Sequence, residues 1–214
     1  MSNHLFVPSG ILFQTFSEKC SLESRNGIIQ ARWVVDTIEN WQSDSRLTPA
    51  LLLEAQRLAV NQIYRCAGHF RNGPVRLAGA EHGPPEHEAV PLPVDEMCAY
   101  VQAHWDSNAV HLASYLMWRI NWIHPFFGGN GRTSRAISYL VLCARLGFVI
   151  PGTKTIPDFI VEERQPYYSA LREADEAWRG GEVNVSAMEA LLSSLLAKQL
   201  VSIHHQATGK DETS

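Results

Sequence analysis

The sequence has 214 residues, of which 45% are hydrophobic and 19% charged, so the chain is long enough and apolar enough to bury a core. Its formal net charge of −4 argues against a chain-wide electrostatic surface for nucleic acid. No segment approaches the roughly 20 consecutive apolar residues of a membrane span. Four widely spaced cysteines without a CxxC pair indicate core thiols in a reducing compartment. We therefore expect a globular protein of the cytoplasm, with export as an effector left open.

Helical periodicity dominates the first part of the chain. Apolar residues recur every three or four positions between 28 and 41, which predicts an amphipathic helix. Thr48 and Pro49 supply the N-cap and the first position of a second predicted helix, and Gly68 ends it.

The segment 69–93 breaks this pattern with prolines and glycines. It contains a short strand-like stretch, Val75, Arg76 and Leu77, so we expect a loop or a small hairpin, called the flap below. A loop this long in a compact domain is often functional.

Helical patterns resume after the flap and continue almost to the end. The predicted segments are 94–105, 109–123, 131–146, two that follow Pro157 and Pro166, and a last helix that begins near Asn184 or Ser186. The stretch 109–123 is apolar nearly all round, which is typical of a central core helix. The sequence thus predicts an all-α fold with one small β-hairpin flap.

The most informative stretch is His124-Pro-Phe-Phe-Gly-Gly-Asn-Gly-Arg-Thr-Ser-Arg135. Its glycines permit a close backbone approach, and it delivers free N–H groups to a helix start, where the helix dipole favours an anion. Asn130 adds an amide donor, and Arg132 and Arg135 share one helix face and suit phosphate oxygens. His124, at the other end of the loop, titrates in the range of a general base. A base beside a phosphate site predicts phosphoryl or nucleotidyl transfer.

This stretch resembles the signature of the Fic (Fido) family, His-Pro-Phe-x-[Asp/Glu]-Gly-Asn-Gly-Arg-x-x-Arg. The matching positions are His124, Pro125, Phe126, Gly129, Asn130, Gly131, Arg132 and Arg135. The flap and the segment 166–175 also resemble the family, so that the likeness covers roughly residues 25–200 and is looser outside the signature. The resemblance implies a Fic-like helical bundle.

The same resemblance implies a transferase that moves AMP from ATP onto a Ser, Thr or Tyr hydroxyl of a target protein. His124 would take the proton from that hydroxyl, and Phe126 would anchor the loop in the core. The phosphates would be held by residues of the loop and of the helix start: Gly129, Asn130 and Gly131 around the α- and β-phosphates, Arg132 at the outer phosphates and Arg135 at the γ-phosphate.

The flap would bind the target. Val75, Arg76 and Leu77 would pair with an extended segment of the target by strand addition and so place its hydroxyl. The partners implied are ATP and a target protein that the sequence does not identify, with self-modification and homo-oligomers left open.

One position departs from the family signature. The acidic residue that holds Mg²⁺ in the family falls at position 128, where this chain has glycine. Mg²⁺ or Mn²⁺ would then be held mainly by the ATP phosphates and by water, or an acid of the flap (Glu81, Glu86 or Glu88) would replace the missing carboxylate. Gly128 also leaves open the transfer of another phosphate-containing group, or a catalytically weak module that binds a nucleotide or a protein.

A second family motif concerns regulation. Many relatives are inhibited by a helix with the pattern [Ser/Thr]-x-x-x-Glu-[Gly/Asn], whose Glu pairs with the second signature arginine. The segment from Val35 to Asn40 resembles that motif, although Val35 replaces Ser or Thr. The resemblance therefore implies that Glu39 pairs with Arg135, and the alternative is a solvated charge on an amphipathic helix.

These interpretations divide the chain as follows: an N-terminal extension (1–24), a Fic-like domain (25–206) with its inhibitory helix (25–42), flap (69–93) and signature (124–135), and a disordered tail (207–214). The His/Glu clusters of the flap, at 81–82 and 86–88, lack the helical i, i+4 spacing of a zinc site, so we expect no dedicated protein metal site.

Overall fold

The computed structural model describes residues 10–76 and 83–208, with side chains as far as residue 203. Eight α-helices and one short 3-10 helix, η1, account for the ordered elements of these residues. They are α1 (Phe16–Glu39), α2 (Pro49–Val60), η1 (His87–Ala89), α3 (Pro91–Ala103), α4 (Ala109–Ile123), α5 (Asn130–Leu146), α6 (Ile156–Glu162), α7 (Arg164–Arg179) and α8 (Ser186–Thr208). The predicted all-α class is confirmed.

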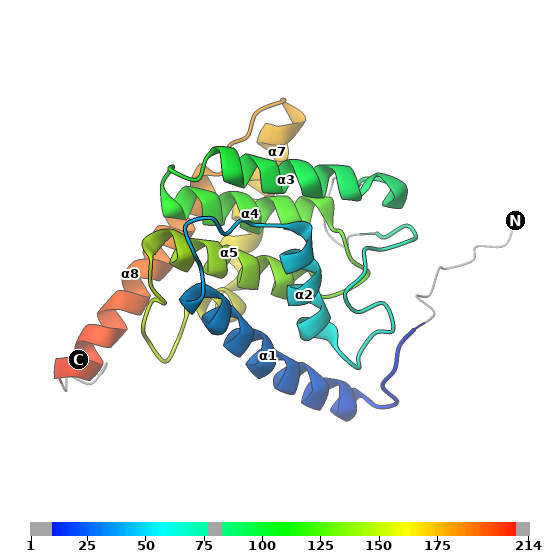
Figure 1. Ribbon diagram of the computed structural model, residues 1–214, viewed down its shortest axis with the longest axis horizontal. Coiled ribbons are helices and arrows are strands. Elements are labelled where there is room, and N and C mark those ends of the chain that lie inside the picture. The colour runs from blue at the N-terminus through cyan, green and yellow to red at the C-terminus, as the bar shows by residue number, and fades with distance from the viewer. Residues whose placement is uncertain (1–9, 77–82, 209–214) are drawn as a thin grey trace, which may run out of the picture.

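Helices α4 and α5 form the centre of the molecule and make the most extensive helix pair. Figure 1 shows α3 on one side of this pair and α1 on the other. Ten of the 15 residues of α4 are buried, because α3, α5, α7 and α8 all pack against it. This explains why α4 is apolar on nearly every side.

Helix α7 is fastened to α4 by a cluster of aromatic side chains around a buried cation. The guanidinium carbon of Arg119 lies 4.5 Å from the ring centroid of Trp122 and 4.4 Å from that of Trp178. Trp118 Nε1 donates a hydrogen bond to Asp175 Oδ1 at 2.8 Å. These contacts hold α7 beside the central pair.

Helix α1 is longer than predicted. It begins at Phe16 rather than near residue 28, because the Thr15 side chain accepts a hydrogen bond from Glu18 N and caps it. Gln30 Nε2 donates to Ala55 O within α2, and Asn26 Nδ2 donates to Asn61 O at the end of α2, each at 2.7 Å. Polar side chains thus dock this half of the helix, which a search for apolar periodicity misses. The limits proposed as 25–42 are corrected to Phe16–Glu39, and residues 16–24 belong to this helix.

The structure describes the two ends of the predicted flap, so its hairpin stays a prediction. In the part of the chain that the structure describes, Val75 and Arg76 lie in irregular structure, and Leu77 falls outside the described residues. The antiparallel bridge that the structure does show joins Ile11 to Tyr64. Residues 91–93 belong to α3 rather than to the flap, since Pro91 and Pro93 fit the first turn of a helix.

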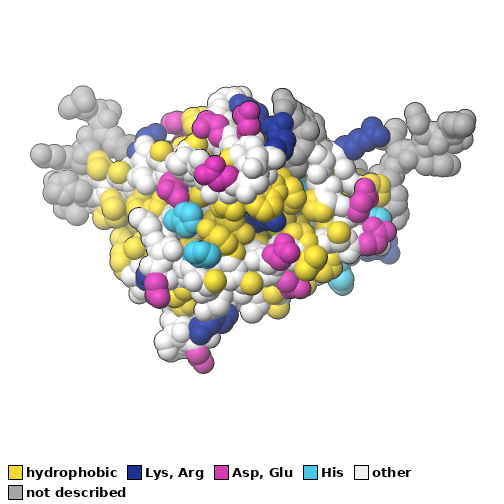
Figure 2. Space-filling model, turned by 90° about the horizontal axis from the view of Figure 1, so that it is seen from above, with side chains coloured by type: hydrophobic (Ala, Val, Ile, Leu, Met, Phe, Trp, Pro, Cys, Tyr) yellow, Lys and Arg dark blue, Asp and Glu magenta, His cyan; other side chains and the backbone are white. Residues whose placement is uncertain are grey.

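The surface over α3 and α7 is apolar at its centre, with acidic side chains around it (Figure 2). Among the helices described, none has the length and apolar character needed to cross a membrane. Residues 207 and 208 of the predicted disordered tail belong to α8, and the rest of that tail, 209–214, falls outside the described residues.

The central helix gives a stability prediction. Leu116 is fully buried in α4, so Leu116→Ala should lower the free energy of unfolding by about 2–5 kcal/mol, measured by urea denaturation. Leu92→Ala is the matched control, because Leu92 on α3 is 64% exposed and its loss should change stability by less than about 0.5 kcal/mol. Equal losses in the two variants would contradict the central position of α4.

Candidate active site

His124 stands at the turn that follows α4. It is the C-cap of that helix, its backbone N–H donates to Ile120 O at 3.0 Å, and its φ of 48° and ψ of 58° are left-handed. This conformation is uncommon for a residue with a Cβ and needs support from its surroundings. The turn directs the chain away from α4 and toward the start of α5.

The signature loop is closed by its own side chain amide. Asn130 Nδ2 donates to Phe126 O at 2.8 Å, and Phe126 N donates to Asn130 Oδ1 at 3.1 Å. Both residues are buried, with Phe126 fully enclosed. The side-chain amide of Asn130, expected from the sequence to bind a phosphate, instead holds the loop. Its backbone N–H remains the group that would face an anion.

The glycines of the loop permit close packing on α2. Gly129 has a φ of 83°, and a Cβ there would lie 2.7 Å from Val60 Cγ1. Gln56 Nε2 donates to Gly128 O at 3.1 Å, and Gln56 Oε1 accepts from Gly68 N at 2.6 Å. Gln56 was not singled out from the sequence, where a buried glutamine in a helix gives no signal.

The start of α5 offers backbone N–H groups. Thr133 N already donates to Gly129 O at 2.9 Å, whereas the N–H groups of Asn130, Gly131 and Arg132 precede the first intrahelical bond. Together with the positive end of the helix dipole they make an anion-binding position. At Gly131, Arg135 Nη1 lies 3.3 Å from the position that a Cβ would occupy.

The two signature arginines differ in their surroundings. Arg132 Nη1 donates to Ala59 O at 2.9 Å, and Arg132 Nη2 lies 3.4 Å from Glu23 Oε1 of α1. Arg135 makes no hydrogen bond or ion pair with any residue that the structure describes. Burial lowers the pKa of Arg135, and the charges of Arg132 and Arg164 act in the same direction, but a guanidinium stays protonated.

Both arginines line a cavity of about 480 Å³ between α1, α5 and the segment 149–161. The α1 side of this cavity is formed by residues 27–35. Glu39, the last residue of α1, is exposed and is not among them. It lies about 24 Å along the helix from Glu23. Pairing of Glu39 with Arg135 therefore stays a prediction, while Glu23 is the carboxylate that meets a signature arginine here.

Position 128 does not fit a metal-binding carboxylate. A Cβ on Gly128 would lie 2.6 Å from Tyr64 Cε2, so the Tyr64 ring occupies the space that an acidic side chain would need. Tyr64 is held through its backbone by the bridge to Ile11. The residues of this loop thus do not suit a protein-held Mg²⁺.

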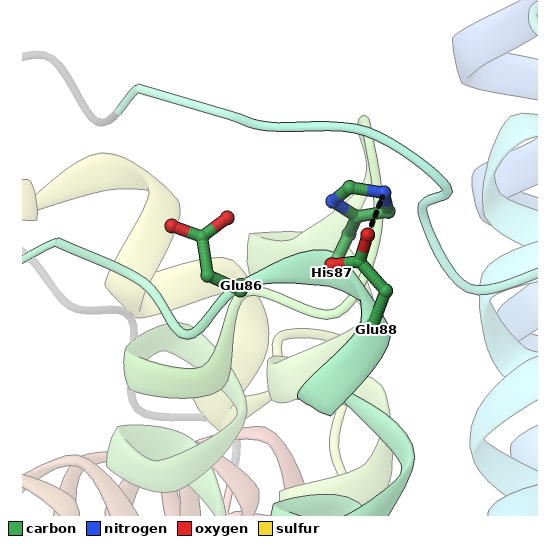
Figure 3. A group of neighbouring side chains, drawn as sticks. All are labelled: Glu86, His87 and Glu88. Carbon is green, nitrogen blue, oxygen red and sulfur yellow. Dashed lines mark ion pairs between the residues drawn. The ribbon is translucent and has the colours of Figure 1, made fainter.

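Of the flap acids, Glu88 lies on η1 and Glu86 is the N-cap of η1, at the entry to α3. Potential ligand atoms of Glu86, His87 and Glu88 are within 4.8 Å of one another, and Figure 3 shows the ion pair of His87 Nε2 with Glu88 Oε1 at 3.0 Å. All three come from consecutive residues, and both glutamates are exposed. Glu81, the other acid considered, falls outside the described residues.

Arg71 is a site residue whose role the sequence did not indicate. Its Nε donates to His124 O at 2.8 Å and its backbone N–H donates to Pro125 O at 2.9 Å. The first residues of the flap are therefore bonded directly to the loop that begins with His124.

The comparisons with known proteins agree with this geometry. The family model described as Fic/DOC matches residues 46–142. A Drosophila persimilis protein named protein adenylyltransferase Fic is 31% identical over 113 residues, which cover 51% of this chain and 20% of the relative. A Drosophila pseudoobscura pseudoobscura protein of the same name matches equally. The chain thus spans about a fifth of the length of these curated relatives.

Solved structures share the fold at low sequence identity. A Fic domain containing signaling protein from Bacteroides thetaiotaomicron has a TM-score of 0.75 at 21% identity, covering 93% of this chain and 77% of that one. Fic-1 from C. elegans has a TM-score of 0.70 at 18% identity, covering 95% and 55%. BepC from Bartonella tribocorum, solved with bound AMPPNP, has a TM-score of 0.57 at 17% identity, covering 82% and 86%.

The contact between Glu23 and Arg132 gives a binding prediction. Glu23→Gln should strengthen pyrophosphate binding up to about fivefold at low salt, because it removes a partly exposed pair that competes for the guanidinium and is worth at most about 1 kcal/mol. Calorimetric titration with pyrophosphate measures this.

Glu39→Gln on the same helix is the control, and it should leave the affinity unchanged. A gain in Glu39→Gln without one in Glu23→Gln would show instead that Glu39 competes for the arginines, as the sequence motif implies.

Proposed function

We propose that this chain, which belongs to the Fic/DOC family, is a protein adenylyltransferase that transfers AMP from ATP to a Ser, Thr or Tyr hydroxyl of a target protein. The observation that carries the proposal is the turn between α4 and α5. It places His124 at one end of a short loop and the free N–H groups of α5, followed by Arg132 and Arg135, at the other. The Drosophila relatives named adenylyltransferases support the same transfer.

In this reaction His124 acts as the general base. Its imidazole accepts the proton of the target hydroxyl while the hydroxyl oxygen forms a bond to the α-phosphorus of ATP. The bond from that phosphorus to the bridging oxygen of the β-phosphate breaks, and pyrophosphate leaves with the electron pair. The products are an AMP ester of the side chain, pyrophosphate and the proton held by His124.

The remaining residues position the donor and balance its charge. The N–H groups of Gly131 and its neighbours face the phosphates, in the manner of an oxyanion site. Arg135 has no partner among the described residues, so it can receive a terminal phosphate without giving up an existing bond. Arg132 must first exchange its contact with Glu23, which makes α1 a competitor of the donor.

The donor is expected to bring its own metal. Mg²⁺ keeps several waters and binds phosphate oxygens readily, so MgATP can bind without a carboxylate at position 128. In the flap, Val75 is half-buried and Arg76 is exposed, and strand addition by a target segment would use their backbone.

The contact of Tyr64 with Gly128 favours a second candidate function. Without the family's acidic side chain, the same anion-binding position would suit transfer of another phosphate-containing group, or binding of a nucleotide or a protein without transfer. The position of the label in ATP separates these functions.

Incubation with labelled ATP tests the transfer. Label at the α-phosphate should appear on protein, label at the γ-phosphate should not, and His124→Ala should lower incorporation by at least about 100-fold because the general base is lost. Nucleotide affinity of His124→Ala, measured by calorimetry, should stay within about twofold. Incorporation from the γ-label would indicate another transferred group, and tight binding without incorporation would indicate a binding module.

The packing of Tyr64 gives a metal prediction. Tyr64→Ala combined with Gly128→Asp should make ATP binding several-fold more dependent on Mg²⁺, because the new carboxylate then has room beside the phosphates. Gly128→Asp alone should gain less, since Tyr64 obstructs it. ATP titrations in Mg²⁺ and in chelator, with Tyr64→Ala as the reference, measure the interaction. An equal gain in the single and double variants would refute the obstruction by Tyr64.

A further inference from the structure

Arg71 is a buried arginine whose side chain bonds to backbone carbonyls on three segments of the site. It is 3% exposed. Its Nε donates to His124 O at 2.8 Å, its Nη1 donates to Gly73 O at 3.4 Å, and its Nη2 donates to Pro85 O. A guanidinium is suited to this task, because its five N–H groups form a rigid planar fork.

These bonds join the two ends of the flap. Gly73 lies in the entry to the flap and Pro85 in its exit, and 11 residues of the sequence separate them. Arg71 therefore links the two described ends of the flap. The same side chain bonds to the carbonyl of His124, so the position of the flap and that of the predicted base depend on one guanidinium.

The backbone of Arg71 strengthens the connection. Its N–H donates to Pro125 O at 2.9 Å, next to the peptide that its side chain holds. The preceding residue, Phe70, packs on Phe126 with ring centroids 5.8 Å apart. The left-handed turn at His124 is thus fixed by two hydrogen bonds from one residue and by an aromatic contact from its neighbour.

Burying a cation needs compensation, and the surroundings supply little opposite charge. Burial lowers the pKa of Arg71, and the negative charge of Glu86 opposes that effect. The carbonyl oxygens of His124, Gly73 and Pro85 provide the rest through charge-assisted hydrogen bonds. A methionine of similar length would fill the space without joining these segments.

We propose that Arg71 is a positioning residue that orients His124 and ties the flap to it, so that a target segment on the flap is presented at a fixed distance from the base. The inference rests on the proposed adenylyl transfer. It separates two functions of the site: Arg71 contacts the loop at His124 and Pro125, whereas the anion position lies at the start of α5. Loss of Arg71 should therefore impair the transfer step and leave the binding of ATP intact.

The first test compares Arg71→Met and Arg71→Lys with the unmodified chain. For Arg71→Met, kcat for transfer of the α-labelled group should fall by about 100-fold, the order expected when a reacting group is displaced by about 1 Å. The Kd for α,β-methylene ATP, whose α–β link cannot be cleaved, should stay within about twofold. Arg71→Lys should recover only part of the lost kcat, because one ammonium reaches fewer of the three carbonyls than a guanidinium does.

The matched control is Arg145→Met. Arg145 Nε also donates to a backbone carbonyl, that of Trp105, but it lies at the far end of α5, about 22 Å from the first turn. This variant should keep kcat. Parallel losses of kcat, nucleotide affinity and thermal stability in Arg71→Met and Arg71→Lys would show a purely structural role and overturn the inference.

A second measurement decides the inference even if the chain transfers no AMP. Hydrogen exchange of the peptide 124–131 should be faster in Arg71→Met than in Arg145→Met, because the loop has lost its link to the flap. If exchange is faster in Arg71→Met but the unmodified chain transfers no AMP, the positioning role is retained and the proposed function is refuted. Equal exchange in the two variants would refute the positioning role, whatever the activity.

Discussion

The reversal of the chain between α4 and α5 is the constraint on which the rest of the site depends. Residues 124–129 must turn the chain between two buried helices and still place the first N–H groups of α5 ahead of the first intrahelical bond. The turn achieves this with a left-handed residue at each end, His124 and Gly129. The amide of Asn130 closes the loop on Phe126, which anchors it in the core.

Support for that turn comes from segments that are distant in sequence. Gln56 of α2 holds the carbonyl of Gly128, and Arg71 of the flap holds the carbonyl of His124. Carbonyls at the end of a helix and in a loop lack intrahelical partners, and these two side chains satisfy them. The loop is thus held by α2 through Gln56 and by the flap through Arg71.

Helix α1 and Tyr64 set the surroundings of Arg132 and of Gly128. Glu23 meets Arg132 from the first half of α1, whereas the family-like motif around Glu39 lies at the exposed end of that helix. Tyr64 fills the space beside Gly128. At the anion-binding position, arginines and backbone N–H groups therefore supply the positive charge, and Glu23 supplies the opposing negative charge.

The sequence by itself determined the helical class, the core helix 109–123, and the loop that leads from His124 to the helix with Arg132 and Arg135. These features are local: helical periodicity, capping residues and a run of glycines depend on near neighbours in the chain. The structure differs from the prediction at two limits. The flap ends earlier because Pro91 begins α3, and α1 begins earlier because polar side chains dock its first half.

Only the tertiary structure decided which groups meet. The bond of Arg71 to His124 spans 53 residues and that of Arg132 to Ala59 spans 73. No spacing rule predicts such contacts, because they depend on how α2, the flap and α5 pack together. Tertiary packing also decides what lies beside position 128. The sequence shows that a carboxylate is missing there, and the structure shows that the Tyr64 ring occupies the space that it would need.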